Sequence, residues 1–388
     1  MKEPTEFALR KFVAPEFIFG IDARKLTGRY AKNFGARKVL VVSDPRVMAA
    51  GWTDDVIACL REEGVECAVF SSITSNPRAD EVMKGAELYQ REGCNALVAV
   101  GGGSPMDCAK GIGIVCANKR DIIAFEGVDK VELPIPPLIC IPTTAGSAAD
   151  VSQFAIISDV QRRVKFAIIS KMIVPDIALI DPVTTTSMPA ELTAWTGMDA
   201  LCHAIEAYVS TAHSPITDLF ALQAIRLITS NMLPTMVELD NIVLRGEMLL
   251  ACLDAGLAFS NASLGAVHAM AHSLGGLLNA PHGECNAILL PYVIEFNFPA
   301  APDRYREIGK AMGLDMDGMA SRDALSALVA AINHLNKQAK LTYTLGQLGV
   351  DRGIIPTLAE KAMHDPCIFT NPRQPRSKDI EAIYEKAL

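Results

Sequence analysis

Residues 95–115 read NALVAVGGGSPMDCAKGIGIV and carry a clear signal of the fold. The stretch opens with a short apolar run, which is typical of a strand buried on both faces of a parallel sheet. Consecutive glycines at 101–103 end the run, and a helix-like segment follows. This order of strand, glycine turn and helix predicts one unit of an α/β domain.

Four further segments continue the alternation of strand-like and helix-like patterns: KVLVVSD (38–44), TDDVIACLREEG (53–64), ADEVMKGAELYQREG (79–93) and PLICIPT (137–143). Beyond about Pro189 the apolar residues recur with a helical period, and no strand pattern interrupts them. We therefore expect an α/β domain with a parallel sheet at 1–187 and an all-helical domain at 188–388.

Composition limits the possible partners. The chain has 388 residues, of which half are hydrophobic, and this is enough for two cores. Its net charge is −8, and Lys and Arg are spread along the chain. Because the basic face that offsets phosphate charge is missing, we expect no nucleic-acid partner.

Cysteine usage and hydropathy indicate the compartment. The ten cysteines form no CxxC pair, so they predict reduced thiols in the cytoplasm rather than a disulfide frame or a four-thiolate zinc site. The opening MKEPTEFALRKF has charges where an export signal needs an apolar core. The apolar segment 248–278 is interrupted by polar residues and glycines, which favours buried core helices over a membrane span.

Three features follow expected strands, where an open parallel sheet binds its ligands. They are Asp44, GGGS (101–104) and TTAGS (143–147). The glycines would let backbone amides approach a pyrophosphate, and Asp44 could accept hydrogen bonds from a ribose diol, which favours NAD over NADP. However, GGGSPM lacks the last glycine of G-x-G-x-x-G, and Asp-Pro is also a common turn start, so the pattern alone leaves a cofactor-free turn open.

Histidines gather in GMDALCHAIEAY (197–208) and GAVHAMAHSLGGLLNAPHGECN (265–286). Asp199 and His203 are four residues apart, as are His268 and His272, so each pair shares a helix face. His282 lies between a proline and a glycine. One carboxylate and several imidazoles suit a divalent transition metal, although hydrogen-bonded core pairs are the alternative. Spacing does not choose between His268 and His272 as ligands.

Several motifs in order along the chain carry a family resemblance: GGGSPMD, PTTAGSAADVS, GMDALCHAIEAY, GAVHAMAHSLGG, PHGECNAILLP and DPCIFTNPR. Together they resemble the iron-containing (group III) alcohol dehydrogenases. The resemblance implies that the α/β domain at 1–187 binds a dinucleotide, that the helical domain at 188–388 binds metal and substrate, and that the active site lies between them. It also implies reversible hydride transfer between NAD(H) and a small primary alcohol or aldehyde.

The resemblance also implies roles for individual residues. Asp199, His203, His268 and His282 match the metal ligands, with Fe²⁺ expected and Zn²⁺ as the alternative, and His272 matches a catalytic histidine that is not a ligand. The expected cofactor contacts are Asp44, Asn76, Gly102, Gly103, Ser104, Thr143, Thr144, Ser147, Lys165 and Leu179. The expected substrate-pocket residues are Phe154, Phe259 and Cys367.

Two other functions share these features. Enzymes of the dehydroquinate synthase type, and relatives that act on glycerol or sugar phosphates, combine NAD with a metal but need Lys and Arg near the metal. Residues 199–208 and 259–286 contain neither, which favours a small uncharged alcohol. A non-catalytic protein that binds metal and NAD is the other alternative. The family further implies a homo-oligomer, with a dimer expected.

Overall fold

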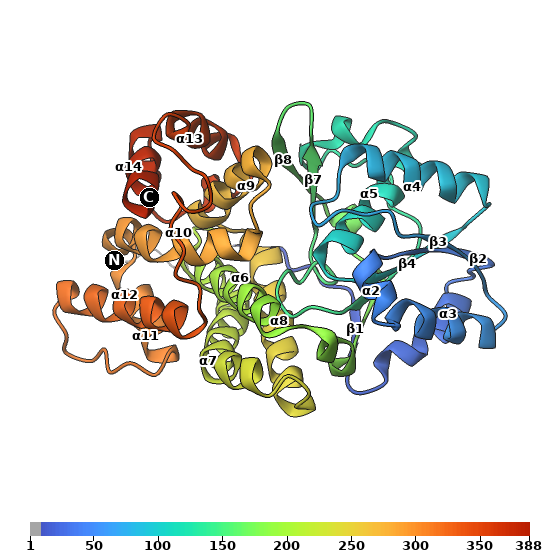
Figure 1. The fold of residues 1–388 in the computed structure, drawn as a ribbon, viewed down its shortest axis with the longest axis horizontal. Coiled ribbons are helices and arrows are strands. Elements are labelled where there is room, and N and C mark those ends of the chain that lie inside the picture. Colours follow the sequence, from blue (N-terminus) through green and yellow to red (C-terminus); the bar gives the residue numbers. More distant parts are fainter. Residues whose placement is uncertain (1–8) are drawn as a thin grey trace. The chain divides into compact units, whose positions relative to one another are not determined.

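The structure, a computed structural model, describes residues 9–388, and the chain divides into two compact units (Figure 1). The sheet unit comprises Ala14–Met188 and Leu239–Leu249. The helical unit comprises the described N-terminal residues up to Val13, together with Pro189–Glu238 and Leu250–Leu388.

The two units differ from the expected division at 187/188 in two short segments, each of which belongs to the other unit. Val13 joins the helical unit, where the Asn261 side chain bonds its backbone N–H at 2.6 Å and its carbonyl at 3.1 Å. Residues 239–249 join the sheet unit, where the buried Arg245 donates to the Met188 carbonyl at 2.7 Å. These are contacts between residues far apart in the chain, which local sequence patterns do not reveal.

The main sheet of the sheet unit has six strands, and every pairing is parallel. In spatial order they are β1 (Glu16–Phe19), β9 (Ile177–Ile180), β6 (Leu138–Pro142), β4 (Ala96–Gly101), β2 (Lys38–Val42) and β3 (Glu66–Phe70). The expected parallel sheet is therefore present.

Apolar residues of the central strands face both sides of this sheet. On β2, Leu40 and Val42 pack against α4 (Ala79–Arg91) and α5 (Gly103–Asn118). Val39 and Val41 pack on the opposite face against α1 (Thr27–Asn33) and α3 (Trp52–Glu62). Helices on both faces explain why these strands are almost continuously apolar.

A second, three-stranded sheet was not expected from the sequence. It has the order β5 (Gly127–Val128), β8 (Val164–Ile169), β7 (Phe154–Asp159), and β7 and β8 pair antiparallel. The remaining short elements of the sheet unit are α2 (Pro45–Ala49), η2 (Ala23–Leu26), η3 (Ile122–Phe125), η4 (Lys171–Ile173) and η5 (Pro182–Ser187).

The described part of the helical unit contains no strand, as the periodicity predicts. Its helices are α6 (Ala190–Val209), α7 (Pro215–Val237), α8 (Ile242–Ala262, which begins in the sheet unit), α9 (Ala266–Leu278), α10 (His282–Asn297), α11 (Pro302–Ala311), α12 (Ser321–Gln338), α13 (Ile355–His364) and α14 (Ser377–Ala387), with the short η6 (Phe298–Ala300) and η7 (Pro366–Thr370). Within residues 9–388, none of the helices combines the length and hydropathy of a bilayer span.

Candidate metal and nucleotide sites

Three helices of the helical unit bring the expected metal ligands together. Helix α6 carries Asp199 and His203 one turn apart, α9 carries His268, and His282 is the first residue of α10. Gly283 permits this arrangement, because a Cβ at that position would lie 2.2 Å from the backbone oxygen of Trp195 in α6. The close approach of α10 to α6 places His282 beside Asp199.

The geometry of this Asp-His cluster fits a divalent metal ion. The Nε2 atoms of His268 and His282 each lie 3.6 Å from Asp199 Oδ1, and that of His203 lies at 3.8 Å. Ligand atoms held tetrahedrally at about 2.1 Å from one ion lie about 3.4 Å from each other. Ligand atoms of Asp199, His268 and His282 all lie within 4.8 Å of one another, and His203 joins this group through its approach to Asp199. One carboxylate with imidazoles around it forms a donor set suited to iron or zinc.

The electrostatics of the cluster also favour a cation. Burial alone would raise the pKa of Asp199, but the surrounding histidines His203, His282 and His268 lower it well below its usual range. Burial alone would lower the pKa of His268, but the carboxylates of Asp199 and Glu206 raise it to about 9. Asp199 therefore stays ionised and able to act as a ligand, and the carboxylates of Asp199 and Glu206 favour positive charge beside His268.

Glu206, which sequence reasoning missed, holds His268 in place. Its buried carboxylate accepts hydrogen bonds from His268 Nδ1 at 2.6 Å and from the backbone N–H groups of Val267 at 2.6 Å and His268 at 3.4 Å. These backbone groups belong to the first turn of α9, which has no capping side chain of its own. Gly265 leaves the space, since a Cβ there would lie 2.9 Å from Glu206 Oε1. Glu206 thus caps α9 and directs His268 Nε2 toward Asp199.

Asn286 and Phe259 complete the surroundings of the cluster. The Asn286 amide donates to Asp199 Oδ1 at 2.7 Å, which fixes the carboxylate. The ring of Phe259, an expected pocket residue, stacks on His203 at a centroid distance of 4.3 Å, and His203 in turn stacks on His268 at 4.4 Å. The position of Asn286, four residues after His282 on α10, was the only sequence signal for its role.

His272 lies beside the cluster, but the structure gives it different partners. Its ring is nearly parallel to that of His282, at a centroid distance of 5.2 Å and an angle of 12°. Its Nδ1 contacts Asp365 Oδ2 at 2.8 Å, and the backbone N–H of Cys367 donates to Asp365 Oδ1 at 2.8 Å. Cys367, another expected pocket residue, is fully buried, and this burial raises the pKa of its thiol. Sequence reasoning missed Asp365.

In the sheet unit, the expected phosphate-binding turn meets the loop after β6. Gly101 has a φ of +150°, and Gly102 precedes the first turn of α5. A Cβ on Gly102 would lie 3.0 Å from Thr144 Oγ1, and a Cβ on Gly103 would lie 2.9 Å from Ser147 Oγ. The absence of side chains on these glycines lets the two loops pack together at the N-terminus of α5, which is where a phosphate group would be stabilised.

Other expected cofactor residues surround this turn. Ser104 donates to the Ser75 carbonyl at 2.5 Å, so Asn76 lies in the adjacent loop. Asp44 caps α2 through Oδ1, which accepts from the N–H groups of Arg46 at 2.8 Å and Val47 at 3.1 Å. The remaining expected residues are Thr143 at the end of β6, Lys165 on β8 and Leu179 on β9. The Leu179 side chain is fully buried in the core beside α1 and α3, away from solvent.

A buried lysine supports the start of β7. The Lys110 side chain on α5 is fully buried and donates to the carbonyls of Ser152 and Phe154 at 2.7 Å each. Burial lowers the pKa of Lys110. Phe154, the expected limit on substrate size, therefore has its backbone tied to the helix that begins at the glycine turn.

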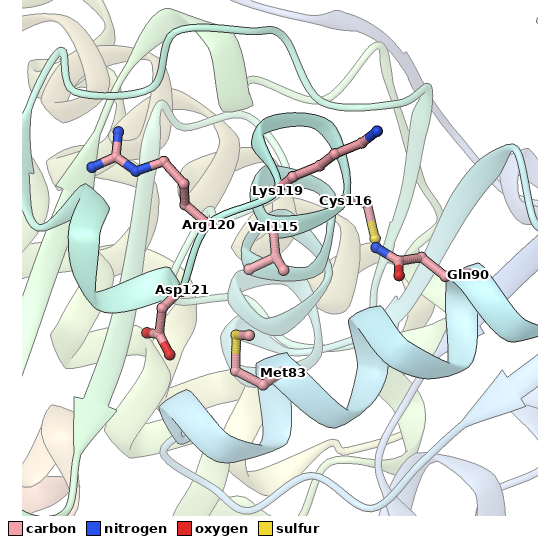
Figure 2. Close-up of a pocket in the computed structure, with 7 residues that line it drawn as sticks. All are labelled: Met83, Gln90, Val115, Cys116, Lys119, Arg120 and Asp121. Carbon is pink, nitrogen blue, oxygen red and sulfur yellow. The ribbon is translucent and has the colours of Figure 1, made fainter.

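One surface pocket of the sheet unit is lined by other residues. This pocket has a volume of about 640 Å³. Figure 2 shows the side chains that line it, which come from α4, from the end of α5 and from the residues that follow α5. Its lining residues are Met83, Gln90, Val115, Cys116, Lys119, Arg120 and Asp121. None of them is an expected site residue, so this pocket does not mark the candidate site.

The parallel sheet with its glycine turn and the helical unit with its Asp-His cluster define a class, namely enzymes that combine a nucleotide with a divalent metal. Two family models match this chain. The model described as "Iron-containing alcohol dehydrogenase" matches residues 14–182, and "Fe-containing alcohol dehydrogenase family, C-terminal" matches residues 193–388. The chain therefore belongs to the iron-containing alcohol dehydrogenase family.

Individual relatives agree with this assignment. The chain is 40% identical to 1,3-propanediol dehydrogenase from Klebsiella pneumoniae over 372 residues, which cover 95% of this chain and 96% of the relative. It is 37% identical to NAD-dependent methanol dehydrogenase from Bacillus methanolicus, over 97% of this chain and 99% of the relative. A crystal structure of 1,3-propanediol oxidoreductase superposes with a TM-score of 0.95 at 39% identity, over 98% of this chain and 100% of that structure. The predicted family, fold class and enzyme class are confirmed.

Proposed function

We propose that this alcohol dehydrogenase transfers hydride reversibly between NAD(H) and a small, uncharged primary alcohol or its aldehyde. The observation that carries the proposal is the placement of three imidazole Nε2 atoms 3.6 to 3.8 Å from Asp199 Oδ1. A cluster of this composition is expensive to bury unless its polar atoms share a common partner.

Asp199, His203, His268 and His282 are proposed to hold Fe²⁺, and the same donor set accepts Zn²⁺. When bound, the cation polarises the substrate oxygen and so favours loss of hydride from the neighbouring carbon. The protein supplies orientation: Glu206 and Asn286 fix the ligands, and Phe259 shields one face of His203. His272, which has other partners, is proposed to transfer the proton.

NAD is proposed to bind along the carboxyl ends of β2, β4 and β6. The first turn of α5 would hold the pyrophosphate, and Thr143, Thr144 and Ser147 lie on the adjacent loop. Both capping bonds of Asp44 use Oδ1, so Oδ2 can accept a ribose hydroxyl, and its charge would repel the extra phosphate of NADP. One relative is named as NAD-dependent.

The substrate is proposed to be small and uncharged because residues 199–208 and 259–286, which supply the proposed ligands, contain no Lys or Arg. Phe259 and Cys367 present apolar or weakly polar surfaces, and both are buried. This surface suits a short alkyl chain and disfavours phosphate or carboxylate groups.

The test combines metal analysis with a substrate screen. The purified protein should contain one iron or zinc per chain and oxidise NADH with short aldehydes. His268→Ala should lose both metal and activity, whereas His272→Ala should lose activity but keep the metal. Equal metal loss in the two variants would show that the ligands are wrongly assigned. Turnover restricted to phosphorylated or carboxylated compounds would overturn the proposed substrate class.

A cytoplasmic homodimer is also proposed. Strand β1 lies at the edge of the main sheet and exposes Phe17 (41%) and Phe19 (38%), an apolar edge that a second copy could cover. All ten cysteines lie in the described residues and are free thiols, which suits a reducing compartment. Sedimentation of the purified protein as a monomer would contradict the dimer.

A further inference from the structure

Helix α9 presents two histidines one turn apart, and each gives its Nδ1 to a different carboxylate. His268 Nδ1 contacts Glu206 of α6 at 2.6 Å, and His272 Nδ1 contacts Asp365 at 2.8 Å. An ionised carboxylate only accepts hydrogen bonds, so each Nδ1 must carry the proton. In a neutral ring this leaves Nε2 as the acceptor. His268 Nε2 faces Asp199 and is a proposed metal ligand. His272 Nε2 is not part of the proposed ligand set.

Asp365 is itself held firmly. It precedes η7, where its Oδ1 accepts the Cys367 N–H at 2.8 Å, so only Oδ2 is directed at His272. Asp365 is buried, with 8% of its surface exposed. The neighbouring segment is anchored to α9 by the Ser273 hydroxyl, which donates to the Leu358 carbonyl of α13 at 2.8 Å. The direction of the Asp365–His272 hydrogen bond is therefore set by the fold rather than by a flexible side chain.

We infer that Asp365 is a positioning residue that holds His272 in the Nδ1–H tautomer, with the Nε2 lone pair ready to accept the alcohol proton. This rests on the proposed function. During oxidation the O–H bond breaks and its proton passes to Nε2, while the C–H bond breaks and its hydride passes to the nicotinamide. Reduction of the aldehyde returns both. A carboxylate, a histidine and a reacting hydroxyl form the arrangement by which many enzymes orient a base.

A second cation held by the same residues is the competing explanation. Ligand atoms of His272, Asp365 and Cys367 all lie within 4.8 Å of one another. However, both oxygens of Asp365 already accept N–H donors, and the hydrogen bond to His272 uses the nitrogen that a cation would need. The hydrogen-bonded arrangement satisfies these groups without an ion.

Asp365→Asn separates positioning from folding. Asn is also a good capping residue, so its oxygen can keep the bond to the Cys367 N–H. Its amide nitrogen would then donate toward His272 Nδ1 and force the proton onto Nε2. By analogy with an aspartate-to-asparagine change in a catalytic triad, which costs about 10⁴ in kcat, we expect kcat to fall on the order of 10³-fold with KM little changed.

The decisive readout is the tautomer. In zinc-loaded protein with ¹⁵N-labelled histidine, nuclear magnetic resonance should show His272 protonated at Nδ1 in the wild type and at Nε2 in Asp365→Asn. Metal content and the thermal unfolding midpoint should stay unchanged. Asp121→Asn is the matched control, because Asp121 likewise caps a short helix, at the Ile123 N–H, but contacts no histidine. It should behave as the wild type.

Three results would overturn the inference. The first is His272 protonated at Nε2 in the wild type, and the second is kcat of Asp365→Asn within threefold of the wild type. The third is a second zinc ion per chain that Asp365→Asn removes, which would establish the cation site instead. Failure of the proposed function would look different: the wild type would turn over no alcohol, while the tautomer measurement would still decide the role of Asp365.

Discussion

Replacing Glu206 with Gln should weaken metal binding even though Glu206 is not a proposed ligand. Oε1 accepts the Val267 N–H, and Oε2 accepts both the backbone N–H and the ring Nδ1–H of His268. Gln offers only one acceptor oxygen, so an amide N–H must face either the first turn of α9 or the His268 ring. The negative charge that strengthens His268 as a ligand is lost as well.

The expected magnitude follows from these contacts. Loss of a carboxylate that orients a ligating histidine typically costs 10- to 100-fold in metal affinity, or about 1.4 to 2.7 kcal/mol. The misdirected amide leaves at least one buried N–H without an acceptor, which should lower the free energy of unfolding of the metal-free protein by about 1 to 3 kcal/mol.

The assay is a competition between the protein and a chelator for zinc, combined with urea unfolding of the metal-free protein. Glu191→Gln is the control, since Glu191 is an exposed residue in the first turn of the same helix, α6. It should bind zinc as the wild type does. If Glu206→Gln is folded and its zinc affinity lies within twofold of the wild type, the argument that Glu206 supports the metal site is refuted.

Other perturbations test the remaining parts of the structure. Lys110→Met should lower the free energy of unfolding by about 2 kcal/mol, because two buried carbonyls lose their donor; an unchanged urea midpoint would contradict this. Gly103→Ala should raise the Kd for NADH at least tenfold in a fluorescence titration while metal content is kept, since the new Cβ would lie 3.0 Å from the Ser147 Cβ. Burial raises the pKa of Asp254 to about 7, above its unfolded value near 4, so the folded state loses stability as pH rises from about 4 to 7. Asp254→Asn should therefore unfold at a higher temperature than the wild type at pH 8 and lose most of that advantage at pH 5, whereas an equal difference at both pH values would exclude this cause.

Local patterns predicted three adjacent strands of the main sheet and the helical second half, but not the other strands of that sheet or the second sheet. Strands β2, β4 and β6 are apolar on both faces and stand out in the sequence for that reason. Strand β1 is short and largely exposed, and the β7–β8 pair is antiparallel, so neither follows the pattern of a buried parallel strand. Their places depend on pairing with residues far along the chain.

The candidate site shows the same division. The sequence alone determined that Asp199 and His203 share one helix face, that His268 and His272 share another, and that a glycine turn opens α5. Residue spacing did not distinguish His268 from His272, whereas the tertiary structure gives the two side chains different partners. Both occupy equivalent positions on α9, but one faces Asp199 and Glu206 while the other faces Asp365, and these partners are 62 to 93 residues away in the chain. Helical periodicity sets the direction in which a side chain points, whereas the packing of distant elements decides what it meets there.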